Sequence, residues 1–440
     1  MGQDYYLYFS LILSFSLIII SCFSLLHNIR FITIISGYTL IKILLLIFVF
    51  DQVVSSFGYQ QDNERYYRGF ASIAQADFSL FNLYEVYKNL LVSTRSFNNG
   101  FSFIYINAIF YKVLGLEGDY QQFALINYIL NIFYELFISY LIYSLCKTYF
   151  NQRVGIIATA LFLCYAERFV FSLVPLKETF STFALFPVLY LIIVNRKKQK
   201  KTMKNILLQI VLLVSNVFNR VASYLLFPVI LILTKNIINK RRYKSIIKFS
   251  FISAVVIIFV ILLAPFNVSE AIYDSVGYWV IYVTNNEEVL MKNLTLLPYN
   301  LLRFGISPYP FSILNDNHNN TLLWLMIFPT AIKYGIILFY ISTLYFRYFT
   351  HKILPGAINL FVDFTVISLL IILSLVPGDY RFIQVLFPFV TIISAFMITT
   401  AKNGPIIFIL TILSSCIYYM KIFGILDLLS YFIRQVVPLI

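Results

Sequence analysis

The sequence predicts an all-α polytopic membrane protein with about twelve transmembrane helices. Of its 440 residues, 60% are apolar and only 12% are charged, which is about half the charged share of a soluble domain. Many apolar runs approach the roughly 20 residues that a helix needs to cross a hydrocarbon core. The 19 Asp and Glu residues are absent from the loops in which Lys and Arg concentrate.

This charge segregation predicts the orientation of the chain. The basic loops are His27–Arg30, Lys147–Arg153, Asn195–Lys204, Lys235–Lys248, Arg347–Lys352 and Lys402. By the positive-inside rule, these loops face the cytoplasm. An acidic flank precedes the first apolar run at Asp4, and Asp427 follows the last one. An even number of spans therefore leaves both termini on the extracytoplasmic face.

Hydropathy and loop charge together give the order of the spans. We expect them at residues 5–26, 31–51, 121–146, 153–170, 176–195, 204–218, 221–235, 248–267, 321–346, 355–376, 383–400 and 404–422. The short pair 204–218 and 221–235 fits either two spans or a re-entrant hairpin. No Pro/Gly-rich linker or internal repeat divides the chain, so residues 1–440 are expected to form a single membrane domain.

Two long loops, residues 51–120 and 267–320, fall on the outer face and carry most of the acidic residues. Within the first, residues 100–116 are apolar and aromatic with Lys112 near the end, which favours an interfacial or partly inserted helix. Residues 272–283 could form a similar element in the second loop. The predicted architecture is therefore a helical bundle with two elaborated outer loops.

The net charge of +14 does not indicate nucleic-acid binding, because the basic residues lie in short loops and no soluble basic domain is present. Anionic membrane lipids are the expected partners of these loops. The four cysteines show no paired spacing, so neither a disulfide framework nor a zinc site is indicated.

The strongest candidate site is the segment Tyr59–Arg68, just past the outer end of the second span. Asp62 could take a proton from an attacking hydroxyl, with Glu64 orienting the acceptor. Arg65 and Arg68 could bind phosphate oxygens, while the tyrosines pack on sugar rings. This composition suits a sugar on a lipid phosphate. It equally suits a Tyr-rich interfacial anchor.

Further ionisable groups recur at outer span ends. Each alone fits a snorkelling side chain, but together they predict an electropositive rim for a lipid phosphate. The candidates for binding substrate or phosphate at this rim are Lys177, Glu178, Arg220, Arg303 and Arg381. Glu178 is also a candidate, with Glu64, for orienting the acceptor. Glu167 and Arg168 flank the same turn as Lys177 and Glu178.

The run Asp62-Asn63-Glu64 invites comparison with the acidic motif that holds a metal and a nucleotide sugar in soluble transferases. Its single copy and its outer location oppose that function, and a lipid-linked donor is the consistent substitute. No metal site or other cofactor is indicated, although a divalent cation is compatible with the site. Inside the spans the ionisable residues are Lys42, Glu135, Lys333 and Asp363, which could pair with one another or line a polar cavity.

The order of several motifs resembles that of the GT-C membrane glycosyltransferases. These motifs are Asp62 with Tyr66, the segment Gly100–Gly115 ending in Phe-Tyr-Lys-Val-Leu-Gly, the region Cys146–Gly155, the turn Pro175–Glu178, and Arg381 followed by Pro388. The resemblance covers residues 60–191 best. It implies that Asp62 is the catalytic base, that Lys177, Arg220 and Arg381 bind phosphate, and that polyprenyl-linked sugars are the donors at an extracytoplasmic site.

An extra span before Asp62, and the lack of a large soluble C-terminal domain, favour the O-antigen and capsule polymerases within this class. Such an enzyme would act in the bacterial cytoplasmic membrane on a polyprenyl-linked glycan donor and a glycan acceptor, with a chain-length regulator as a further expected partner. Two alternatives stay open. One is a transferase of single sugars from a polyprenyl monophosphate, and the other is a flippase of lipid-linked oligosaccharides, which would be expected to show related halves.

Overall fold

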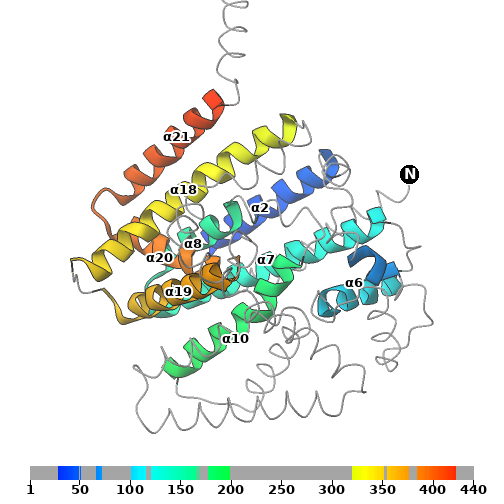
Figure 1. Cartoon of the computed structure of the whole chain (residues 1–440), viewed down its shortest axis with the longest axis horizontal. Helices are drawn as coiled ribbons and strands as arrows, with labels where there is room; N and C mark the ends of the chain where they lie inside the picture. The colour runs from blue at the N-terminus through cyan, green and yellow to red at the C-terminus, as the bar shows by residue number, and fades with distance from the viewer. Residues whose placement is uncertain are drawn as a thin grey trace, which may run out of the picture.

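The computed structural model describes residues 28–48, 50, 66–71, 101–114, 120–165, 168, 177–198, 320–350, 354–375 and 384–422. Within these ranges the chain is helical and contains no strand, as the sequence predicts. The helices are α2 (Ile29–Phe48), α6 (Phe101–Leu114), α7 (Tyr120–Tyr149), α8 (Gln152–Cys164), α10 (Glu178–Lys198), α18 (Asn320–Tyr348), α19 (Gly356–Leu375), α20 (Phe387–Thr400) and α21 (Gly404–Ile422) (Figure 1).

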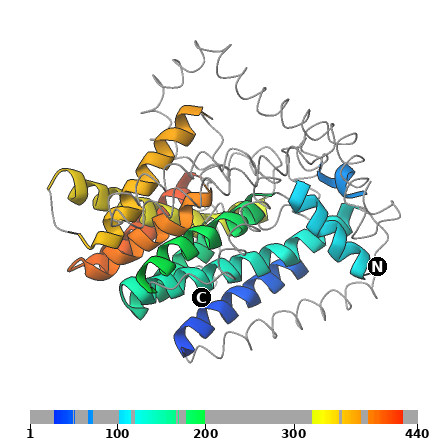
Figure 2. The same ribbon diagram turned by 90° about the horizontal axis from the view of Figure 1, so that it is seen from below.

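Helix α7 organises the N-terminal half of the bundle. It packs against α6, α8 and α10, and it lies between α2 and α10 in both ribbon views (Figures 1 and 2). In the C-terminal half, α20 packs against α8, α18 and α19, while α21 packs along α18. Helices α8 and α20 therefore join the two halves, and the core lies around them.

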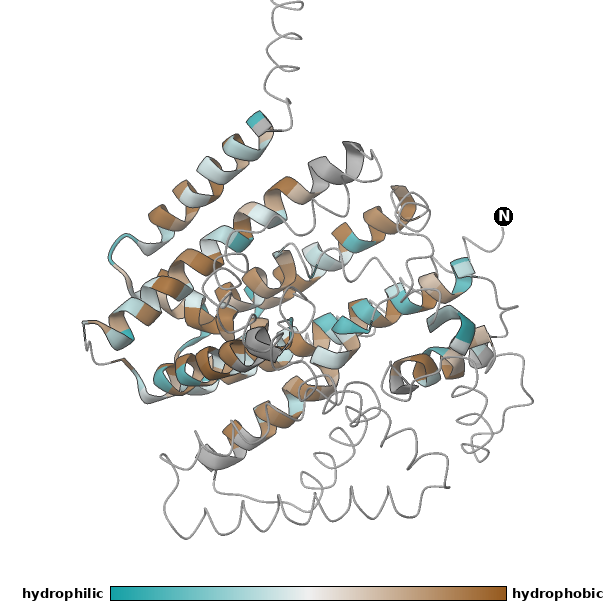
Figure 3. Cartoon of the chain, in the orientation of Figure 1, coloured by the Kyte–Doolittle hydropathy of each residue, from teal (hydrophilic) through white to brown (hydrophobic). Residues whose placement is uncertain are grey.

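Among the described residues, four helical stretches are long and apolar enough to cross a membrane, judged by length and composition: Ile29–Phe48, Tyr120–Tyr149, Met326–Tyr348 and Gly404–Lys421. They match the spans predicted at 31–51, 121–146, 321–346 and 404–422. The outward side chains of α21 are large, apolar and exposed; examples are Ile406, Ile409, Leu410, Leu413 and Ile417. Such side chains favour hydrocarbon over water as the surrounding solvent. Brown, apolar residues likewise recur along the helices in Figure 3. A face of this kind is stable against lipid and not against water.

One predicted span is interrupted in the structure, and another starts with a 3₁₀ turn. The span predicted at 153–170 is wrong as a single helix, because α8 ends at Cys164 and Tyr165 is extended (φ −80°, ψ 153°). Similarly, a 3₁₀ turn at residues 384–386 precedes α20, which begins at Phe387 with Pro388 in its first turn. Proline suits that position because its missing N–H is not needed there. Hydropathy carries the first of these spans past the end of α8, because Phe169 and Val170 resume the apolar composition after Glu167 and Arg168.

The remaining boundaries agree with the predictions within three residues, and helix ends commonly vary by one or two. Helices α10 and α19 begin at Glu178 and Gly356, against predicted starts at 176 and 355. Helix α6 covers residues 101–114 of the predicted segment 100–116, and the interfacial position of that segment stays a prediction. The spans 5–26, 204–218, 221–235 and 248–267 and the element 272–283 lie outside the described residues. The count of about twelve spans, the single domain and the outer location of the termini also stay predictions.

The contact between α18 and α21 depends on Gly335. A Cβ atom at this position would overlap the ring of Phe408 on α21. We expect Gly335→Leu to lower the free energy of unfolding by about 1–3 kcal/mol, because overpacking forces the two helices apart. Thermal unfolding of the detergent-solubilised protein measures the effect. The matched control is Gly37→Leu, since a Cβ at Gly37 meets nothing within 4 Å. Equal unfolding midpoints for the two variants would contradict this account of the contact.

Candidate functional site

A stripe of polar side chains runs along one face of α7. Asn127, Asn131, Glu135 and Ser139 follow one another at intervals of four residues, and each is fully buried. This spacing places all four on the same face of an α-helix. A carboxylate in such a place is costly unless cations and hydrogen-bond donors surround it. We therefore expect a functional site on the polar face of α7.

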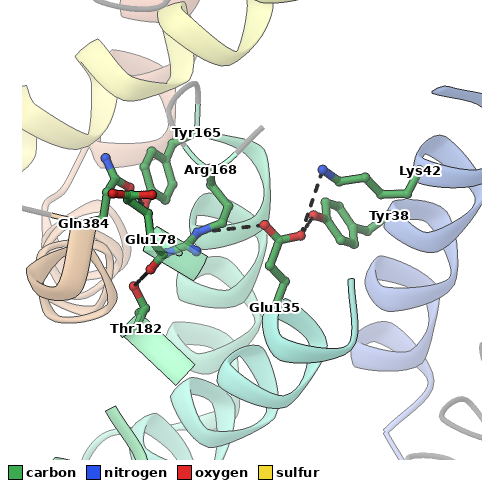
Figure 4. Close-up of polar contacts among 8 residues, drawn as sticks. All are labelled: Tyr38, Lys42, Glu135, Tyr165, Arg168, Glu178, Thr182 and Gln384. Carbon is green, nitrogen blue, oxygen red and sulfur yellow. Dashed lines mark hydrogen bonds and ion pairs between the residues drawn. The ribbon is translucent and has the colours of Figure 1, made fainter. Parts of the chain in front are cut away.

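Glu135 has two cationic partners and one hydroxyl partner (Figure 4). The Nζ atom of Lys42 lies 3.9 Å from its Oε2 atom, and Nε of Arg168 lies 4.0 Å from its Oε1 atom. The hydroxyl of Tyr38 donates a hydrogen bond to Oε2. Since Tyr38 and Lys42 are four residues apart, one face of α2 supplies both groups. The carboxylate thus joins α2, α7 and the segment that follows α8.

Arg168 extends this network to α10. Its side chain is only 1% exposed, and Nη2 donates to Oγ1 of Thr182 over 3.3 Å. The Thr182 hydroxyl in turn donates to the backbone carbonyl of Glu178 over 3.0 Å. The guanidinium carbon lies 4.9 Å from the ring centroid of Phe162 and 5.9 Å from that of Tyr165. The cation is therefore held between a carboxylate, a hydroxyl and two aromatic faces.

The end of α8 and the start of α20 meet beside Arg168. The Tyr165 hydroxyl donates to Oε1 of Gln384 over 2.5 Å. The Tyr165 ring also stacks on Phe387, with centroids 4.2 Å apart and planes inclined by 8°. Non-helical backbone at membrane depth is tolerated where protein buries it or where it lines a cavity. Tyr165 and Gln384 thus contact each other between the end of α8 and the start of α20, and Gln384 follows the predicted phosphate ligand Arg381 by three residues.

Two segments that the sequence nominates separately lie together in the structure. Tyr66, which follows Glu64 by two residues, is 2% exposed. The Nζ atom of Lys177 lies 5.6 Å from the centroid of its ring. Phe103 of α6 packs edge-on against Tyr66 at 5.5 Å and contacts Phe180 of α10 at 6.3 Å. Residues 66–71, α6 and the first turn of α10 thus form one aromatic contact region.

The structure describes three of the residues that the sequence assigns to the site. Arg68 is exposed, whereas Lys177 and Glu178 are buried, at 5% and 1% exposure. Lys177 and Glu178 begin α10 and do not form an open rim in this structure. The other candidates, Asp62, Glu64, Arg65, Arg220, Arg303 and Arg381, lie outside the described residues. The functional roles of all of these residues stay predictions.

Part of the buried network around Glu135 could be predicted from the sequence. The expected pairing of intramembrane charges is confirmed for Lys42 with Glu135. Asp363, however, pairs with Arg347 from a basic loop, at 3.3 Å, and accepts a hydrogen bond from Tyr348 over 2.8 Å. No sequence signal joins Arg168 to Glu135, which it follows by 33 positions. Within the described residues no group of three or more His, Cys, Asp or Glu residues is arranged to hold a metal ion.

No family model matches this chain, and a comparison with curated proteins found no match. Among solved structures, the chain is similar to the oligosaccharyltransferase of Archaeoglobus fulgidus in its apo form (TM-score 0.49) and in complex with Zn and sulfate (TM-score 0.47), with 12% identity in both cases. The matches cover 84% and 82% of this chain and 50% and 47% of the respective solved chains. This chain thus spans about half the length of those proteins. No activity follows from a likeness of this degree.

The Glu135 network predicts a large loss of stability in Glu135→Gln. That change removes the carboxylate charge that faces the buried Lys42 and Arg168, which is expected to cost about 3–5 kcal/mol. The matched control is Asp363→Asn, because Arg347 and Asp363 are 35% and 29% exposed and such a pair contributes at most about 1 kcal/mol. Thermal unfolding in detergent compares the two. A smaller loss for Glu135→Gln than for Asp363→Asn would contradict the central role of this carboxylate.

Proposed function

We propose that this chain is an integral membrane glycosyltransferase of GT-C type. It would transfer a glycan from a polyprenyl-(di)phosphate carrier to a hydroxyl group of a glycan acceptor. The main supporting observation is the contact between Tyr66 and Lys177. It joins the segment after the predicted catalytic acids to the turn that carries a predicted phosphate ligand. A base and a phosphate-binding cation must lie near each other in such a reaction.

The proposed reaction begins with Asp62 accepting a proton from the acceptor hydroxyl, whose oxygen attacks the anomeric carbon of the donor sugar. The bond from that carbon to the phosphate oxygen breaks, and its electron pair leaves with the carrier phosphate. Lys177, Arg220 and Arg381 are proposed to balance the charge on this leaving group. Asp62 precedes Tyr66 by four residues, a length of chain that reaches at most about 14 Å. Glu64 or Glu178 would orient the acceptor.

The physical character of the bundle supports a substrate borne by lipid. The outward faces of α18 and α21 carry large exposed apolar side chains such as Leu338 and Leu413. The interior contains buried charges at Lys42, Glu135 and Arg168. A polyprenyl-linked glycan has the same division, with a long apolar chain and a charged phosphate. Such a donor can approach through the hydrocarbon core and present its phosphate to buried cations.

Within this class we favour a polymerase of O-antigen or capsule repeat units in the bacterial cytoplasmic membrane. Its site would face the outside, and a chain-length regulator of the pathway would be a partner. These proposals rest on the charge segregation and on the order of motifs in the sequence. A transferase that adds a single sugar from a polyprenyl monophosphate would use the same residues, and the two differ in the mass of the product.

The catalytic assignment predicts that Asp62→Asn lowers glycan transfer by about 10²–10⁴-fold, the usual contribution of a general base. Membrane-reconstituted protein with a polyprenyl-linked glycan donor is the system, and mass spectrometry of the lipid-linked product is the measurement. Addition of whole repeat units indicates a polymerase, and addition of one residue indicates the single-sugar enzyme. Asp77→Asn, the same change in the same outer loop, should keep full activity. Undiminished transfer by Asp62→Asn would rule out this base.

The proposed orientation predicts the labelling of single cysteines introduced into the loops. A membrane-impermeant thiol reagent added to intact cells should modify Asn63→Cys, in the first outer loop. It should leave Gln199→Cys, in the basic loop 195–204, unmodified until the membrane is permeabilised. The wild-type protein, with its four native cysteines, sets the background. The reverse pattern would place the acidic loop on the cytoplasmic face and contradict the positive-inside assignment.

A further inference from the structure

The side chain of Arg168 is held inside the bundle and is only 1% exposed. Its guanidinium carbon lies 4.9 Å from the ring centroid of Phe162 and 5.9 Å from that of Tyr165, and its Nε atom lies 4.0 Å from Oε1 of Glu135. Because Glu135 also accepts a hydrogen bond from Tyr38 of α2, that carboxylate is itself held in place on α7. An effect of Arg168 on a substrate would therefore pass through its protein neighbours.

A hydrogen bond connects Arg168 to α10. Its Nη2 atom donates to the Thr182 hydroxyl oxygen over 3.3 Å, and that hydroxyl donates its single proton to the backbone carbonyl of Glu178 over 3.0 Å. A threonine hydroxyl has one O–H donor and two lone pairs, so both bonds can exist together. Thr182 is fully buried, and Figure 4 shows Arg168 between Glu135 and Thr182. The two bonds end on the backbone of the first turn of α10.

The first turn of α10 carries two of the predicted site residues. Lys177 directly precedes the helix, and Glu178 begins it. The carbonyl of Lys177 accepts from both the backbone N–H and the hydroxyl of Ser181, over 2.8 Å and 2.9 Å. The Nζ atom of Lys177 lies 5.6 Å from the ring centroid of Tyr66. A displacement of this turn would therefore move a predicted phosphate ligand together with a candidate for orienting the acceptor.

We propose that Arg168 and Thr182 are positioning residues that hold the first turn of α10 in place for the reaction. Arginine suits this role because its planar guanidinium presents several donors in fixed directions, here toward Thr182 on α10 and Glu135 on α7. Arg168 would thus set the position of Lys177 without touching the donor itself. The consequence for glycan transfer rests on the proposed function, whereas the restraint on α10 rests on the hydrogen bonds alone.

Thr182 offers a matched pair of substitutions. Thr182→Val keeps the shape of the side chain but removes the hydroxyl, whereas Thr182→Ser keeps the hydroxyl. The control is Thr343→Val in α18, because Thr343 is also fully buried and its hydroxyl also donates to a carbonyl one turn earlier, that of Phe339, over 2.8 Å. Arg168→Met removes the other partner of the hydrogen bond. The Thr182 pair tests the proposal even if Arg168→Met does not fold.

Hydrogen exchange of full-length protein in detergent, read by mass spectrometry, reports the restraint on α10. Peptides that cover its first turn should exchange about tenfold faster in Thr182→Val, the effect of losing a hydrogen bond. Thr182→Ser and Thr343→Val should exchange there as wild type does. The double variant of Arg168→Met and Thr182→Val should exchange more slowly than the product of the two single effects predicts, because both changes remove the same bond.

Transfer kinetics test what the restraint does for the reaction. Lys177 is proposed to bind the carrier phosphate, so its displacement in Thr182→Val should raise KM for the polyprenyl-linked donor by about tenfold, the usual effect of a lost hydrogen bond to a charged group. Thr182→Ser should show the wild-type KM. A general loss of stability would instead lower the amount of active enzyme and leave KM unchanged.

Four results would each overturn the positioning role. They are wild-type exchange of the first turn in folded Thr182→Val, equal acceleration in Thr182→Ser, fully multiplicative effects in the double variant, and a loosened turn with an unchanged KM for the donor. Failure of the proposed function looks different, because the wild-type protein would then transfer no glycan. The exchange experiment would still decide whether Arg168 and Thr182 restrain α10.

Discussion

The carboxylate of Glu135 is the group on which the described core depends. It lies on the polar face of α7 between Lys42 of α2 and Arg168, and Arg168 continues the connection to Thr182 of α10. In an apolar bundle, packing against lipid or protein is nearly equivalent, so polar contacts between helices specify which faces meet. Buried charges restrict the arrangement further, because each requires a partner in one place. This network thus fixes α2, α7 and α10 relative to the end of α8.

The end of α8 at Cys164 affects which side chains reach this network. A continuous helix through residues 153–170 would keep the backbone satisfied but would also carry Tyr165 and Arg168 along the axis of the helix. By ending at Cys164, α8 releases these side chains toward Gln384 and Phe387 at the start of α20. The buried backbone there is enclosed by protein, which makes the break tolerable. Polar contacts within this apolar fold therefore lie at the end of α8 and the start of α20.

The candidate site combines two environments. One is the aromatic contact of Tyr66 with Lys177 and Phe103, adjacent in sequence to the proposed catalytic base. The other is the charged cluster of Glu135, Lys42 and Arg168. The first turn of α10 belongs to both, since Lys177 contacts Tyr66 and the Glu178 carbonyl accepts from Thr182. The first turn of α10 therefore links the residues around Tyr66 to the buried charges.

The sequence by itself determined that the protein is helical and that lipid surrounds it, because hydropathy and loop charge reflect the transfer of side chains into hydrocarbon. It also indicated that Lys42 and Glu135 need partners, since lone charges are unfavourable in a bilayer. It placed the end of α8 too late, because Phe169 and Val170 resume the apolar composition after Glu167 and Arg168. It could not join Arg168 to Glu135 or Tyr66 to Lys177, because these contacts link distant positions through packing. Only the tertiary structure decided which polar side chains share the core, as helix faces meet according to shape and charge and not according to order in the chain.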